Sequence, residues 1–189
     1  YKYFSLSYHY LYKISTTTEY MLHFIHNISL NGQYDYSKLF IDYKHIINNT
    51  QSPQIIFNTK VILNSNIQSP DFENIYIGGE NFIRGYYPNP IDNHVESQNN
   101  LIFKNLIFSS IQFEIPINMT SSQFIQTKLL FFYDYGIGAD KYNDFSKNNK
   151  LEGHGFGISI ATINQMKFDI CIGLNHFGSR TIHFIRNIN

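Results

Sequence analysis

The sequence predicts an all-β fold, a transmembrane antiparallel β-barrel, from three observations. Apolar and polar residues alternate with a period of two along most of the chain, whereas helical periodicity is hard to find. Most alternating runs approach the length of about 9–11 residues that a tilted transmembrane strand needs, against about 5–6 for a soluble strand. The connections also alternate between tight turns and long loops, which is typical of transmembrane barrels.

We expect nine strands, separated by clusters of Asn, Gly, Pro and Ser. In chain order they cover residues 3–14, 20–30, 37–47, 55–64, 103–115, 125–136, 154–163, 167–174 and 181–188. The connections at 31–36 and 163–166 are tight, and those at 65–102 and 137–151 are long. Tyrosines gather near strand ends, as in the aromatic girdles of membrane barrels.

Alternation also predicts where the carboxylates of the later strands point. In the sixth expected strand, Asp134 lies opposite a face of apolar and aromatic side chains. In the fifth, Glu114 shares a face with Ser110 and Gln112. If the apolar face meets lipid, both carboxylates point into the lumen. A soluble sandwich or lipocalin-like barrel would show the same alternation with its apolar face inward, so this alternative stays open.

The composition argues against several classes of function. The 14 basic and 14 acidic residues give a net charge of zero, so no overall field favours nucleic acid. Cys171 is the single cysteine, which excludes a disulfide scaffold. The histidines are scattered, and His23 and His26 face opposite sides of one strand, so we expect no metal site. No nucleophile–base constellation or phosphate loop appears, so we expect neither an enzyme nor a cofactor.

The long connection at 65–102 contains a glycine-rich segment with one arginine, GGENFIRGY, from Gly78 to Tyr86. Gly78, Gly79 and Gly85 read either as ordinary turn glycines or as positions that need positive φ and close approach to a wall. Arg84 reads either as a solvated loop charge or as a group that folds into the lumen. In the second interpretation its guanidinium meets Asp134 or Glu114 in a charge-assisted, bidentate contact.

These features together resemble the outer-membrane protein assembly and translocation barrels. That superfamily includes the bacterial barrel-assembly insertase, two-partner secretion transporters, the mitochondrial sorting-and-assembly barrel and the plastid import channel. Its signature is an arginine-glycine-aromatic tetrapeptide a few residues after Gly-Gly, which Ile83–Tyr86 matches here. A glutamate shortly before a proline follows at 112–116, then an aspartate before a glycine at 132–136, then a glycine-alternating strand at 153–158.

The resemblance implies that the chain holds the C-terminal half of a sixteen-stranded barrel, about nine strands. Residues 1–189 would form part of one barrel domain, with the loop at 65–102 entering the lumen. Its implied lock consists of the loop residues Gly78, Gly79, Ile83, Arg84, Gly85 and Tyr86 and the partners Asp134 and Glu114. In this lock Arg84 would pin the loop against Asp134, with Glu114 nearby. The implied activity is non-enzymatic. The implied partners are unfolded precursors or barrel clients, membrane lipids and other translocon or assembly subunits.

The departures from the family pattern bear on location. The chain lacks the family's first seven strands and its soluble POTRA repeats, so we expect it to be a piece of a longer protein. Its last residues lack the terminal aromatic of bacterial members, which favours an organelle. Tyr86 and the Asn- and Ile-rich composition favour a plastid of the apicoplast type. The alternatives are a mitochondrial or bacterial assembly insertase, a passive porin and a soluble ligand-binding barrel.

Overall fold

The computed structural model describes residues 3–15, 18–29, 35–47, 53–65, 73–87, 101–117, 125–145, 150–162 and 166–188. Nine long strands form one sheet in the order β1-β2-β3-β4-β7-β8-β9-β10-β11. Neighbouring strands of this sheet pair antiparallel. The strands are β1 (Tyr3–Ser15), β2 (Thr18–Ser29), β3 (Asp35–Ile47), β4 (Gln54–Asn64), β7 (Asn105–Ile117), β8 (Ile125–Ala139), β9 (Lys150–Thr162), β10 (Met166–Asn175) and β11 (Arg180–Ile188).

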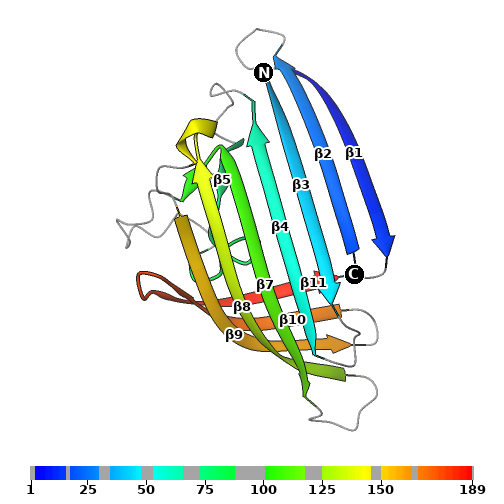
Figure 1. Ribbon diagram of the computed structural model, residues 1–189, viewed down its shortest axis with the longest axis vertical. Helices are drawn as coiled ribbons and strands as arrows, with labels where there is room; N and C mark the ends of the chain where they lie inside the picture. Colours follow the sequence, from blue (N-terminus) through cyan, green and yellow to red (C-terminus); the bar gives the residue numbers. More distant parts are fainter. Residues whose placement is uncertain are drawn as a thin grey trace.

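The nine-stranded antiparallel sheet confirms the fold class that the alternation predicts. The sheet curves strongly, so that β9, β10 and β11 run across the direction of β1 to β4 (Figure 1). It is open, because β1 and β11 stand at the two ends of the strand order. This arrangement fits a part of a barrel. No helix in the described ranges is long and apolar enough to cross a membrane.

Strand ends differ from the sequence-based expectation by a few residues, and two of these differences affect the long connections. The loop expected at 137–151 is shorter, because β8 continues to Ala139 and Ile137 pairs with Lys150 at the start of β9. Gly138, expected in this loop, lies within β8. A Cβ at Gly138 would overlap the Phe103 ring, so the glycine is there for a close approach and not for a turn.

The second difference lies where the long connection rejoins the sheet. The strand expected at 103–115 divides at Lys104 into β6 (Ile102–Phe103) and β7. β6 pairs with β5 (Ile75–Tyr76) in a separate two-stranded ribbon. A 3-10 turn, η3 (Tyr142–Asp144), follows β8. The pairing of β5 with β6 holds the two ends of the long connection together, and residues 77–87 lie against the sheet.

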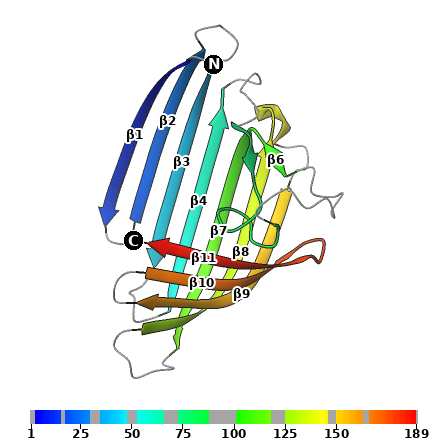
Figure 2. The ribbon, with the colours of Figure 1, turned by 180° about the vertical axis from the view of Figure 1, so that it is seen from behind.

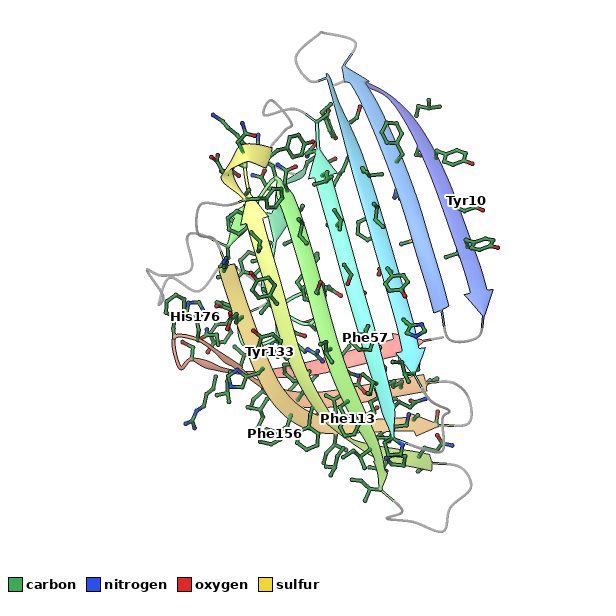
Figure 3. All side chains as sticks on the ribbon, viewed as in Figure 1. Tyr10, Phe57, Phe113, Tyr133, Phe156 and His176 are labelled. Atoms are coloured by element: carbon green, nitrogen blue, oxygen red, sulfur yellow. The ribbon has the colours of Figure 1, made fainter. Side chains whose placement is uncertain are left out.

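The two faces of the sheet have opposite character. Large apolar side chains of β7 to β11 are exposed on the outer face, as Phe113, Tyr133 and Phe156 illustrate (Figure 3). The buried polar and charged residues of these strands lie on the other face and include Ser110, Glu114, Lys128, Asp134, Ser159, Asp169, Asn175, Thr181 and His183. A soluble ligand-binding barrel would have its apolar face inward, and the structure shows the reverse. We call the inner face the lumenal face.

The main hydrophobic core lies between the long connection and the lumenal face. Ile77 and Ile83 of the connection are fully buried and belong to one apolar cluster with Leu106 and Phe108 of β7. From behind, the connection is seen against the inner side of β7 and β8 (Figure 2). Apolar burial of this kind stabilises the docked connection before any charge is considered.

Candidate functional site

Residues 77–83 form a narrow hairpin that positions Arg84. The Ile83 amide donates to the carbonyl of Ile77 at 3.0 Å, and the Gly79 amide donates to the carbonyl of Ile83 at 3.2 Å. Gly79 has a φ of 96°, a left-handed conformation that glycine adopts at little cost. The hairpin, together with the burial of Ile77 and Ile83, fixes the backbone immediately before Arg84.

Arg84 forms a bidentate ion pair with Asp134 of β8. Its Nε donates to Asp134 Oδ2 at 2.8 Å, and its Nη2 donates to Oδ1 at 2.7 Å. The Arg84 backbone amide also donates to Oδ2, at 3.0 Å. The Asp134 side chain is fully buried and that of Arg84 is 7% exposed. This geometry matches the planar fork that arginine presents to a carboxylate.

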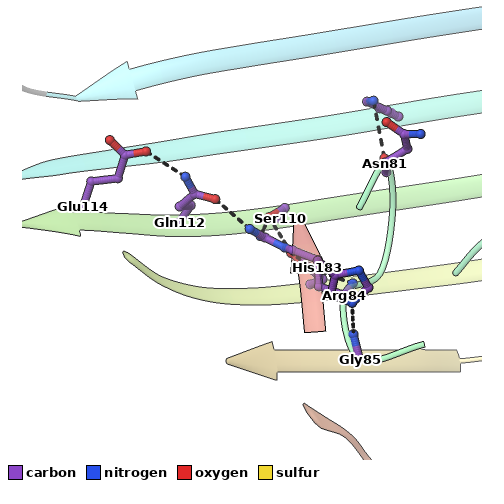
Figure 4. A network of polar contacts seen from close by, with 9 residues as sticks. Asn81, Arg84, Gly85, Ser110, Gln112, Glu114 and His183 are labelled. Atoms are coloured by element: carbon purple, nitrogen blue, oxygen red, sulfur yellow. Dashed lines mark hydrogen bonds and ion pairs between the residues drawn. The ribbon is translucent and has the colours of Figure 1, made fainter. Parts of the chain in front are cut away.

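Three further residues complete the surroundings of the guanidinium (Figure 4). Nη1 donates to Gln112 Oε1 at 2.8 Å, and Nη2 donates to Ser110 Oγ at 3.2 Å. Ser110 in turn donates to Asp134 Oδ1 at 2.6 Å. The guanidinium carbon lies 3.6 Å from the centre of the Phe132 ring, a cation–π contact. The two opposite charges therefore compensate each other in a buried, hydrogen-bonded pair, so removing either partner would leave an uncompensated buried charge.

Glu114 lies near Arg84 but does not bond it directly. Lys128 and Lys167 donate to its two oxygens at 2.9 and 2.6 Å. Gln112 links the two groups, because its amide nitrogen donates to Glu114 Oε1 while its oxygen accepts from Arg84 (Figure 4). Glu114 therefore joins β7 to β8 and β10, and contacts Arg84 only through Gln112.

The backbone around Arg84 lies directly on glycines of the barrel wall. A Cβ at Gly153 of β9 would overlap the Arg84 carbonyl, and a Cβ at Gly173 of β10 would overlap the Gly85 amide. Gly85 itself has a φ of 116°, and a Cβ there would stand 2.7 Å from the Leu174 carbonyl oxygen. Wall and loop are thus both free of side-chain atoms at the contact, which allows the backbone to approach closely.

The remaining glycines that the sequence highlights have other neighbours. A Cβ at Gly78 would press against Tyr76 and the Tyr87 carbonyl, so Gly78 serves packing within the loop. A Cβ at Gly155 would overlap the Ile172 carbonyl and stand 2.6 Å from the Phe132 ring. The ring that stacks on Arg84 therefore needs Gly155 beneath it.

The end of the motif contacts the hairpin made by β10 and β11. Asn175 donates to the Gly85 carbonyl at 3.0 Å, and the Gly85 amide donates to His183 Nε2 at 3.4 Å. The Tyr86 hydroxyl lies 2.9 Å from His176 Nδ1. Burial raises the pKa of Tyr86 to about 12, so the phenol is neutral over the physiological pH range.

The sequence did not identify these hairpin contacts. Alternation correctly places Asn175 on the polar face, and the same period applies to His183, but 90 and 98 residues separate them from Gly85. No local pattern signals such a contact. Sequence reasoning also placed Ser110 and Gln112 on the correct face without assigning them to Arg84.

A cavity of about 250 Å³ adjoins the tip of the hairpin on the lumenal face. Its lining includes Lys44, Asn58 and Lys60 of β3 and β4, Glu80 and Asn81 of the hairpin, and Asp169 of β10. Lys60 lies near the Asn81 carbonyl, 3.5 Å away, and 5.6 Å from the Phe82 ring centre. The lumen beside the docked loop is therefore polar and carries both signs of charge.

Among the described residues, no group of three or more His, Cys, Asp or Glu side chains is placed to hold a metal ion. The arrangement is suited to holding a loop against a wall, since its polar groups satisfy one another across the contact.

Comparison with protein families adds one finding. The family model of the Omp85 superfamily domain matches residues 9–181, which is most of the chain. The match includes the whole loop and the strands β7 to β10, but it ends at residue 181, so most of β11 with His183 lies outside it. No curated protein matches the chain.

Proposed function

The chain belongs to the Omp85 superfamily, whose members reside in outer membranes and insert or transport proteins there, and we propose that it is the C-terminal part of a protein-conducting or barrel-inserting channel. The proposed role is non-enzymatic. Its clients are unfolded precursors or barrel proteins, and its remaining strands and any POTRA repeats belong to the rest of the same protein or to partner subunits.

One observation carries this proposal: the loop segment 77–86 is docked on the lumenal face by a buried, fully paired arginine. The outer face of β7 to β11 is apolar, as a lipid-facing surface must be. A passive porin would need the same outer face, but nothing in solute diffusion calls for a loop tied to one wall by five hydrogen bonds from a single arginine.

In the proposed mechanism, the docked loop holds consecutive strands in register. It contacts β8 through Asp134, β9 through Gly153, β10 through Asn175 and β11 through His183. A sliding or splaying motion of the last strands would break these contacts together. The lock therefore keeps the end of the sheet ordered while the channel accepts a client.

The host membrane is a finer part of the proposal, and we favour the outer membrane of a plastid of the apicoplast type. Support comes from Tyr86, where an aromatic residue with a hydroxyl group resembles the plastid members. In the structure that hydroxyl bonds His176, a contact that phenylalanine could not make. Localisation of the tagged protein by immunoelectron microscopy tests this assignment, and labelling of mitochondria would redirect it.

The lock is tested by Arg84→Ala in the full-length protein, with the exposed Arg180→Ala as the matched control. Loss of the buried cation leaves Asp134 uncompensated, which costs about 3–5 kcal/mol at the contact. We expect client import or insertion to fall at least tenfold while the barrel still accumulates in the membrane. The Arg180 variant should behave as the wild type.

A charge exchange sharpens this test. The double variant Arg84→Asp with Asp134→Arg restores opposite charges and should regain part of the activity. An unchanged client rate in Arg84→Ala would overturn the lock, and a rise in small-solute flux with no effect on clients would favour a porin.

A further inference from the structure

The contact between Gly85 and His183 determines which ring nitrogen carries the proton. An amide N–H can only donate, so His183 Nε2 must present its lone pair to Gly85, 3.4 Å away. The Thr181 hydroxyl lies 2.7 Å from the same nitrogen and can donate to it as well. The single proton of the neutral ring is then on Nδ1, which lies 4.0 Å from Glu80 Oε2.

A second proton on the ring would change this contact. It would place an N–H on Nε2 facing the N–H of Gly85, so the hydrogen bond would be lost and two donors would oppose each other. Thr181 could rotate its hydroxyl and accept, but the Gly85 amide has no such freedom. The imidazolium would instead attract Glu80, which is exposed at the hairpin tip.

Three charged side chains act on His183: Glu80 and Arg84 from the loop, and Asp134 from β8. The residue opposite His183 on β10 is the thiol Cys171. Arg84 and Asp134 largely cancel, because they form the bidentate pair described above. Glu80 is therefore the charge that responds to a proton on the ring.

We propose that His183 is a positioning residue for the loop and that its protonation loosens the loop from the last hairpin. This inference rests on the proposed function, because it concerns the same lock. Neutral His183 holds the Gly85 amide, and protonated His183 exchanges that contact for Glu80. The docking of residues 84–86 then depends on pH through the protonation of this imidazole.

Cys171 provides a reporter within the chain. It is the single cysteine, 1% exposed, lies opposite His183 in the sheet, and interacts electrostatically with Arg84 of the docked loop. The wall residues Leu130, Phe132 and Ile185 also pack around the thiol, and Arg84 is the neighbour that the loop supplies. We expect the departure of Arg84 with the loop to open the thiol to the lumen. The rate at which a small, membrane-impermeant maleimide labels Cys171 therefore measures undocking.

The test compares the labelling rates of wild type and His183→Gln in membranes holding the full-length protein, at pH 7.5 and pH 5.5. Glutamine keeps an acceptor for Gly85 but does not titrate. Dividing one rate by the other cancels the intrinsic pH dependence of thiol chemistry. We expect the wild-type to His183→Gln ratio to rise about fivefold on acidification, as expected for the loss of one hydrogen bond. The outward-facing His154→Gln should show no such effect relative to wild type.

A wild-type to His183→Gln ratio that is the same at both pH values would overturn the inference. An equal change in the wild-type to His154→Gln ratio would overturn it as well. If His183→Gln fails to assemble, amide hydrogen exchange of the wild type decides alone. Protection of the peptide containing Gly85 should fall at pH 5.5 relative to a β8 peptide, after correction for intrinsic exchange, and unchanged protection would refute the proposal. Neither readout uses client activity, so a failure here leaves the Arg84 test of the lock intact.

Discussion

Two clusters of buried charge lie on the lumenal face, and they differ in what they join. Arg84 and Asp134 connect the long loop to β8, whereas Glu114, Lys128 and Lys167 connect wall strands to one another. The first cluster balances its charges by itself, and the second does so with Asp169, whose carboxylate lies 3.5 Å from Lys167. Both bury a carboxylate almost completely. Gln112 bonds both and so links them.

Ion pairs of similar chemistry therefore have different roles, depending on whether they join two wall strands or join the loop to the wall. A pair within the wall stabilises strand register, because its two sides are already held by backbone ladders. A pair between loop and wall determines whether the loop is docked, because no backbone ladder of the main sheet includes residues 77–87. Breaking the first should weaken the barrel, and breaking the second should free the loop.

Glu114→Gln should cause the largest loss of stability, and this loss should be confined to the barrel wall. It removes the carboxylate that Lys128 and Lys167 share, and only Lys167 keeps another, that of Asp169 at 3.5 Å. The loss should lower the free energy of unfolding by about 3 kcal/mol. Urea unfolding followed by far-UV circular dichroism measures this loss. Cys171 labelling in the folded state should not change, since the loop contacts remain. A large increase in labelling would mean that the two clusters act as one.

Gly153→Ala should undock the loop with every charge retained. The added Cβ would overlap the Arg84 carbonyl, and the backbone on either side has little room to shift. We expect a penalty of about 1–3 kcal/mol at the contact, the usual cost of overpacking, and labelling of Cys171 at least fivefold faster. Gly178→Ala is the control, because no atom lies within 4 Å of a Cβ there. Equal labelling in both variants would show that charge alone holds the loop.

Tyr86→Phe should have the smallest effect. The ring stays buried and only the hydrogen bond to His176 is lost, at a cost of about 1 kcal/mol. Labelling of Cys171 should rise only a few-fold, and barrel unfolding should be unchanged. An effect as large as that of Arg84→Ala would assign the lock to the tyrosine.

Much of this site could be predicted from residue order. Period-two alternation correctly placed Asp134, Glu114 and Gln112 on the lumenal face, because side chains along a strand alternate strictly. The family resemblance directed Arg84 to Asp134, with Glu114 nearby. It gave no role to Gln112, which bonds both Arg84 and Glu114, because such a link depends on how deeply the loop meets the wall.

The sequence by itself determined the class of fold, the two faces of the sheet and the presence of a loop that carries one arginine between glycines. These are local properties, set by periodicity and by the conformational freedom of glycine. Tertiary structure alone decided that Gln112 links Arg84 to Glu114, that the loop backbone lies on Gly153 and Gly173, and that Asn175 and His183 contact Gly85. These contacts depend on how strongly the sheet curves and how deeply the loop enters the lumen. Many strands together determine both, so no single sequence position indicates them.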